Sequence, residues 1–166
     1  MLFMKDERDG LECCGGCGMR VAGGTAGCRA LFDDLNAPGA AGPLPDVRRL
    51  IVDVYALQHP DPFCVSAISL AAHLTGVAWI LEHRGDAAHG SEQIRRWLNS
   101  RPALVKPPLP GSYGEVTIDA IVAAMGDEVA GAVDRWARSA WSAYAPLHGV
   151  AREWIASALA YRGHAR

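Results

Sequence analysis

Apolar residues recur every three or four positions along most of the chain, which is the spacing of amphipathic helices. Between Asp46 and His59 they form one continuous stripe: Val47, Leu50, Ile51, Val54 and Leu57. Asp46 is a suitable N-cap for this helix, and Pro60 ends it because proline cannot continue a helix. The opposite face carries a valine, a tyrosine and a histidine, so we expect neighbours on both sides of the helix.

The same periodicity predicts helices over residues 28–35, 64–84, 91–98, 117–125, 127–146 and 147–161. Proline and glycine mark loops over residues 36–45 and 101–114, and Pro146 is expected to break the last long helix. No segment shows the alternation of a β-strand. The sequence therefore predicts an all-α, single-domain helical bundle over residues 29–162, preceded by a Gly/Cys-rich strap over residues 9–28.

The composition narrows the class of protein. A chain of 166 residues with 50% hydrophobic content is long enough for one domain with a full core, which we place at residues 1–166. The net charge is −2 and no basic run occurs, so nucleic acid is not an expected partner. The longest apolar run, Leu70–Leu81, is interrupted by polar residues and by Gly76, so no membrane span is expected either.

The first residues carry charge where a signal peptide needs an apolar core, which favours a cytoplasmic location. In that reducing compartment the five cysteines indicate metal binding or thiol chemistry more than disulfide bonds. The count is odd as well, which a fully paired disulfide scaffold does not give.

The most specific motif is Cys14-Gly-Gly-Cys17-Gly18. Thiolates two residues apart can bind one ion from a single tight turn. Cys28 opens a short helix, and a histidine from the helices would complete the tetrahedral shell that zinc prefers. We therefore predict a Zn²⁺ site formed by Cys14, Cys17 and Cys28 with His59 or His73. A redox dithiol or a strap without any ligand are the alternatives.

The other two cysteines have simpler interpretations. Cys13 is adjacent to Cys14 and cannot easily share the geometry of the same turn, so we expect it to stay outside the site. Cys64 begins an apolar helix, where a free cysteine is usually a small core residue.

Two histidines are placed unusually. His59 ends its helix before a Pro-Asp-Pro turn, where its ring can project toward a neighbouring loop. His73 lies in an otherwise apolar helix, where an unpaired imidazole would cost about 1–3 kcal/mol. A metal, a backbone carbonyl or a carboxylate such as Asp53 must satisfy it. His148, just after Pro146, is a candidate for the same pocket. We interpret His83, His89 and His164 as surface or terminal residues.

A carboxylate within Val52-Asp53-Val54 is costly to bury unless it is paired. Arg49 is one partner for Asp53, and a histidine that Asp53 holds in one tautomer is the other. The candidate catalytic residues are therefore Asp53, Tyr55, His73 and His148. The five tryptophans are interpreted as core anchors and not as a ligand cage.

These motifs together resemble an uncharacterised family of small bacterial Cys/His proteins. That family is recognisable by a CxxCG motif, a later cysteine that opens a short helix, a VDxYxxQHP block and a His-Leu pair. The matching elements here are Cys14–Gly18, Cys28, Val52–Pro60 and His73-Leu74. In that family the position of Arg48 is often histidine. The resemblance implies a shared site but no particular reaction.

Three functions remain open at this point. The first, which we favour, is a metal-dependent enzyme acting on a small molecule, with Arg48 as an anchor for an anionic substrate. It would explain why a carboxylate, a phenol and a second histidine lie near the ligands. The second is a zinc-stapled binding or regulatory module without catalysis, because four protein ligands already close the shell. The third is a thiol or metal sensor in which Cys13 or Cys14 stays reactive.

Overall fold

A computed structural model describes residues 10–37, 45–83, 87–124 and 126–162. The elements follow the order β1 Leu11–Cys13, β2 Arg20–Ala22, α1 Gly24–Asn36, α2 Pro45–Gln58, α3 Pro60–Phe63, α4 Ala67–Glu82, α5 Ala87–Asn99, α6 Asp119–Val122, α7 Glu128–Ala143, the 3-10 turn Ala145–Leu147 and α8 His148–Ala160. The predicted mainly helical fold is confirmed. Of the histidines interpreted above, His164 lies outside the described residues, and so does Met125, the expected end of the helix that became α6.

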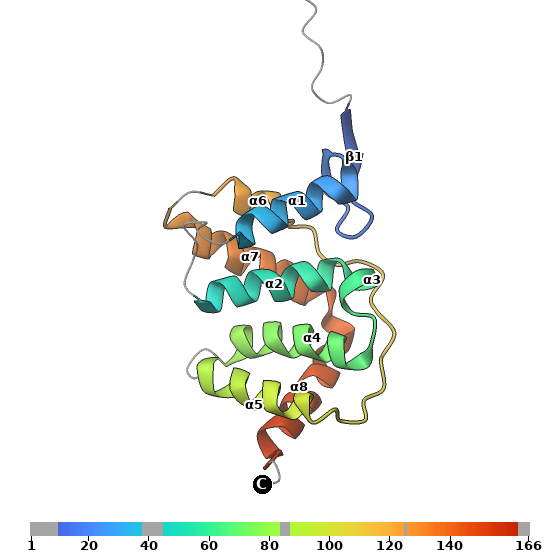
Figure 1. Ribbon diagram of the computed structural model, residues 1–166, viewed down its shortest axis with the longest axis vertical. Helices are drawn as coiled ribbons and strands as arrows, with labels where there is room; N and C mark the ends of the chain where they lie inside the picture. Colours follow the sequence, from blue (N-terminus) through green and yellow to red (C-terminus); the bar gives the residue numbers. More distant parts are fainter. Residues whose placement is uncertain (1–9, 38–44, 84–86, 125, 163–166) are drawn as a thin grey trace, which may run out of the picture.

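The expectation of no β-structure was wrong. β1 and β2 form an antiparallel hairpin in which Cys13 pairs with Arg20, and it projects from one end of the molecule (Figure 1). Each strand has three residues, which is too short for an alternating pattern to be visible in the sequence. Gly18 takes a φ of 76° in the connecting loop, a conformation that favours glycine.

The helices stack in layers below the hairpin (Figure 1). α2 packs between α7 and α4, and α4 also packs against α5 and α8. The break predicted near Pro146 is present as the 3-10 turn between α7 and α8. All five tryptophans are buried, as expected of core anchors: Trp79, Trp97, Trp136, Trp141 and Trp154.

Helices α2 and α4 approach each other closely at one glycine. A Cβ atom on Gly76 would lie 2.2 Å from Oδ2 of Asp53, so a larger residue would displace this carboxylate. The buried stripe of α2 includes Val54 and Leu57, both without exposed surface. This contact brings the polar side chain of Asp53 into the interface between α2 and α4.

The extended segment predicted over residues 101–114 runs along the side of the molecule from α5 back to α6 (Figure 1). The fully buried Gln58 holds its end, because Nε2 donates hydrogen bonds to the carbonyls of Tyr113 (3.0 Å) and Val116 (2.9 Å). Oε1 of Gln58 accepts a hydrogen bond from Nε1 of Trp136 at 2.7 Å. Among the helices of the described residues, none combines the length and the apolar character that a bilayer span needs.

Candidate metal centre

The end of α2 places the ring of His59. The last carbonyls of a helix have no hydrogen-bond donor within the helix. At the end of α2, side chains donate hydrogen bonds to several of these carbonyls. Nδ1–H of His59 donates to the carbonyl of Tyr55 at 2.8 Å, and the hydroxyl of Tyr144 donates to the carbonyl of Leu57 at 2.7 Å. Because Nδ1 carries the proton, Nε2 of His59 presents its lone pair, as a metal-ligating histidine must.

The Cys-x-x-Cys loop packs directly against that ring. The loop is closed by a hydrogen bond from the amide of Cys14 to the carbonyl of Met19 at 2.8 Å, and the amide of Gly15 donates to Oγ1 of Thr25 at 2.9 Å. A Cβ atom on Gly16 would lie 2.3 Å from Cδ2 of His59, so this position has no room for a side chain. The glycine spacing therefore lets the loop reach the end of α2.

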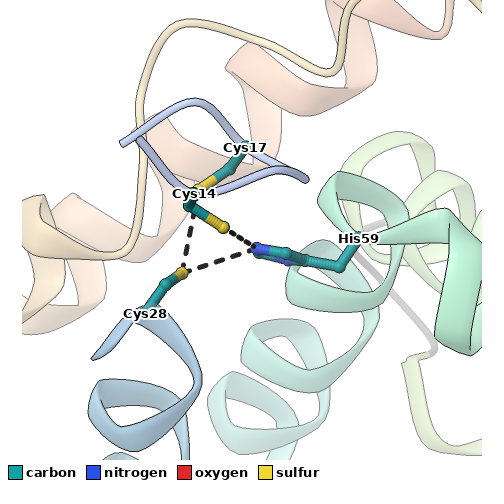
Figure 2. Close-up of side chains that lie close together, drawn as sticks. All are labelled: Cys14, Cys17, Cys28 and His59. Carbon is teal, nitrogen blue, oxygen red and sulfur yellow. Dashed lines mark hydrogen bonds between the residues drawn. The ribbon is translucent and has the colours of Figure 1, made fainter. Parts of the chain in front are cut away.

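Four ligand atoms converge between these segments (Figure 2). Nε2 of His59 lies 3.3 Å from Sγ of Cys14 and 3.4 Å from Sγ of Cys28. Sγ of Cys17 lies 3.8 Å from Sγ of Cys28, and all four ligand atoms lie within 4.8 Å of one another. Zinc–ligand bond lengths give tetrahedral edges of about 3.8 Å between sulfurs and about 3.6 Å between sulfur and nitrogen. The cluster therefore has the size of a tetrahedral metal shell and could hold a metal ion.

The local environment prepares two of the thiols for ionisation. A hydrogen bond from the Cys28 thiol lowers the pKa of Cys17 to about 4, although burial opposes the shift. Burial raises the pKa of Cys14, but the backbone amides of Gly16 and Cys17 and the ring of His59 outweigh it, so the net pKa is lowered. The pKa of Cys28 is raised, because its proton is held by Cys17 and because the thiol is buried. A bound cation would displace that proton.

Comparison with known proteins adds a family but no activity. Residues 12–145 match the model of a family of unknown function, DUF5946. The chain belongs to DUF5946. No curated protein and no solved structure matches it. The resemblance to an uncharacterised family is thus confirmed, and the DUF5946 match includes all four residues of the cluster, whereas His148 lies beyond its end.

Tyr55, which we expected from the sequence to be catalytic, packs against the ring of His59, one of the candidate ligands in this DUF5946 chain. Its buried ring stacks between Phe32, at a centroid distance of 3.9 Å, and His59, at 4.0 Å. Burial and the neighbouring Cys28 raise the pKa of the Tyr55 phenol, so it stays protonated at neutral pH. In this position Tyr55 supports the imidazole and also links α1 to α2.

His73, the other expected ligand, is not part of the cluster. Its Nδ1–H donates to Oδ1 of Asp53 at 2.9 Å, and Nε of Arg49 donates to Oδ2 of the same carboxylate at 3.1 Å. The reason is helical geometry: six residues separate Asp53 from His59, which rotates the two side chains by about 240°. Asp53 therefore faces His73 on α4, while His59 faces the N-terminal loop. Both partners proposed for Asp53 are present at once.

The remaining candidates lie in other surroundings. His148 stacks on Trp141 at a centroid distance of 3.8 Å, and its Nε2–H donates to the Trp141 carbonyl at 2.8 Å. This places His148 at the first residue of α8, outside the group formed by Cys14, Cys17, Cys28 and His59. Cys64 is fully buried with Sγ 3.6 Å from the Ala56 carbonyl, and Cys13 is exposed. Both lie outside the group of four possible ligands in this chain, as the sequence predicted.

Sequence reasoning missed the residues that surround the ligands. From the sequence, Gly16 had no role apart from its place in the Cys-x-x-Cys motif, although its missing side chain makes room for His59. The sequence did not indicate a role for Asp61 or Tyr113, but both line a cavity beside His59 in this DUF5946 chain. The Pro-Asp-Pro turn after His59 was the one local signal for that cavity. Tyr113 gave none, because it comes from a loop 54 residues further along the chain than His59.

Proposed function

We propose that this protein binds one Zn²⁺ ion through Cys14, Cys17, Cys28 and His59, and that the ion is structural. The observation that supports this is the closed ligand set: four protein atoms within 4.8 Å of one another and three of the four residues buried. Structural zinc sites have four protein ligands, whereas catalytic sites keep one position for water or substrate. A saturated shell favours the stapled module over the metal-dependent enzyme.

The donor set supports zinc in particular. Three sulfurs and one imidazole are soft and borderline ligands, which suit zinc and do not suit magnesium or calcium. The hydrogen bond from Nδ1 of His59 to the Tyr55 carbonyl is the outer contact that zinc-binding histidines usually make. We infer that the ion joins the hairpin and α1 to the end of α2, and that the joined surface serves binding or regulation.

Elemental analysis of the purified protein tests the proposal. We expect one zinc ion per chain in the unmodified protein and in Cys13→Ser, and little or none in Cys17→Ser. Cys13 is the matched control, because it lies in the same loop but is exposed and outside the cluster. Cobalt substitution should give the visible spectrum of a tetrahedral thiolate site. Equal zinc contents in both variants, or an octahedral cobalt spectrum, would contradict the proposal.

A second candidate function rests on Asp53 and His73. A buried carboxylate holds Nδ1–H of a histidine whose side chain is 20% exposed, and its Nε2 has no hydrogen-bond partner among the described residues. A carboxylate–histidine pair with a free Nε2 is suited to general base catalysis. On this proposal the chemistry would occur between α2 and α4 and would not use the metal.

Hydrolysis of model esters and phosphoesters tests this second candidate. We expect His73→Gln to lose at least about a hundredfold in rate, the usual contribution of a general base. His83→Gln is the matched control, since His83 follows α4 and stacks on Trp79. Zinc content should be the same in both variants. Equal rates in the two variants, or no turnover by the unmodified protein, would exclude this role.

A further inference from the structure

A cavity of about 300 Å³ lies beside the candidate metal centre, and most of its lining residues are not among the proposed ligands. Its walls come from the Cys-x-x-Cys loop, the first turn of α1, the junction between α2 and α3, and the segment before α6. His59 forms part of the wall, so the cavity and the metal cluster share one residue. A volume near 300 Å³ is at the small end of the range for ligand sites, which fits a compact organic molecule.

The described residues that line this cavity include an acid but no lysine or arginine that could balance its charge. Asp61 contributes a carboxylate and Tyr113 an aromatic ring with a hydroxyl. Burial and then the negative charge of Asp61 raise the pKa of the Tyr113 phenol, which agrees with the two groups facing each other. A zinc ion with three thiolates would add a net charge of about −1 behind His59. These features attract a cation.

We propose that this cavity binds the primary ammonium group of a small organic cation. The carboxylate of Asp61 pairs with the ammonium group, and the ring of Tyr113 attracts the same charge through its face. Pro60 and Pro62 give the cavity rigid apolar walls for a short alkyl stem. This inference rests on the zinc staple of the preceding section, and it adds a ligand site to the joined surface.

One wall of the cavity depends on the metal, and another does not. Gly15 and Gly16 belong to the loop that the ion would fix, whereas Tyr113 is held by Gln58 of the helical core. Removing the ion frees one wall and leaves the other in place. Zinc and the organic cation therefore bind with positive coupling, because the first orders the loop that the second needs.

Titration of ¹⁵N-labelled zinc-loaded protein with butylammonium tests the proposal. We expect saturable shifts of the amide signals of Gly15, Gly16 and Thr25 with a dissociation constant in the millimolar range. Butanol has the same butyl stem with no charge, and butyrate has four carbons with a negative charge; we expect neither to saturate. Lysine-containing tripeptides distinguish a free amine from a lysine side chain as the source of the ammonium group. Equal binding of butanol or butyrate, or no saturable shift with butylammonium, would overturn the proposal.

Variants locate the site. We expect Asp61→Asn to weaken butylammonium binding about tenfold or more and Tyr113→Leu to weaken it several-fold. Asp34→Asn, an exposed acid of α1 outside the cavity, should have no effect. Unchanged binding by both cavity variants would refute the site. Zinc content is measured in the same samples: full zinc without butylammonium binding ends only this inference, whereas a protein without zinc ends the proposed staple.

Discussion

The N-terminal segment, residues 10–37, and the helical body, the described residues from 45 to 162, are held together by different chemistry. The body buries a large apolar core from α2, α4, α5, α7 and α8. The N-terminal segment has only four buried hydrophobic residues, Cys14, Met19, Cys28 and Phe32, and two of these belong to the candidate metal site. A segment with so little apolar burial cannot offset its own ordering entropy without another source of free energy.

The dependence between the two regions runs in one direction. The segment needs the body, because the fourth residue of the candidate metal site is His59 and the ring of Phe32 rests on Tyr55. The body holds those residues by contacts of its own: Gln58 binds Trp136, and Tyr144 binds the carbonyl of Leu57. The body should therefore survive the loss of the segment, whereas the segment should not survive the loss of the ion.

The largest expected effect is that of removing the metal. In the zinc-free protein we expect amides of residues 10–37 to exchange hydrogen rapidly, while those of α2, α4, α7 and α8 stay protected. The reason is that a structural zinc ion contributes about 10–16 kcal/mol of binding free energy, as much as a whole small domain has in stability. Hydrogen exchange followed by mass spectrometry, with and without a chelator, measures this.

Adding zinc back should restore protection and serves as the control. Loss of protection throughout the chain would show that the two regions form a single cooperative unit. Unchanged protection of residues 10–37 would show that the apolar contacts of Phe32 and Met19 are sufficient without the ion.

The next effect concerns the contact between the two regions. Gly16→Ala would place Cβ 2.3 Å from the ring of His59 and 2.9 Å from the carbonyl of Gln58, so the loop must move away from its ligand. Overpacking of this kind costs about 1–3 kcal/mol, which corresponds to a loss of about 5-fold to 150-fold in zinc affinity. Competition with a zinc-binding dye measures the affinity.

Gly15→Ala is the matched control, because its Cβ would only reach ordinary contact with Oγ1 of Thr25 at 3.4 Å. We expect its zinc affinity to stay within about threefold of the unmodified protein. Equal affinities for the two variants would show that the loop is free to adjust and that its close packing on His59 is not required.

The sequence predicted the candidate metal site better than its surroundings, and the reason is distance along the chain. Cys14 and Cys17 are fixed by one turn and Cys28 by the helix that follows, so local spacing was enough to propose all three. The choice between His59 and His73 needed the rotation of α2 and its neighbours. Sequence reasoning recognised both histidines as unusual but could not assign each to its partner.

The fold shows the same division. Helices with a clear apolar stripe, such as α7, were found with small errors at their ends, because burial on one face imposes the pattern. The hairpin was missed because its strands are short. The Cys-x-x-Cys loop that joins them is closed by hydrogen bonds between Cys14 and Met19 and between Gly18 and Cys14. The cavity at Asp61 and Tyr113 was invisible because its walls come from segments far apart in the sequence.

The smallest expected effect concerns an ion pair on the helical body, because the apolar core provides most of the stability of that region. Arg152 of α8 forms two hydrogen bonds to Glu82 of α4, at 2.8 and 3.1 Å, and this bond lowers the pKa of Glu82 although burial opposes it. A lowered pKa stabilises the folded state above the unfolded pKa of about 4.5, and the contribution is lost as the pH falls through the folded value. Because the pair is partly exposed, we expect Arg152→Gln to lower Tm by about 1 °C at pH 7 and not at pH 3.

Arg95→Gln is the control for this last prediction, since its pair with Glu92 lies within one helix and joins no two elements. Thermal unfolding of the zinc-loaded variants measures the difference. A fall in Tm of many degrees in Arg152→Gln would mean that the body, like the N-terminal segment, depends on a single polar link. A small fall would show that the two regions are stabilised in opposite ways. A single ion stabilises the N-terminal segment, whereas many apolar contacts together stabilise the body.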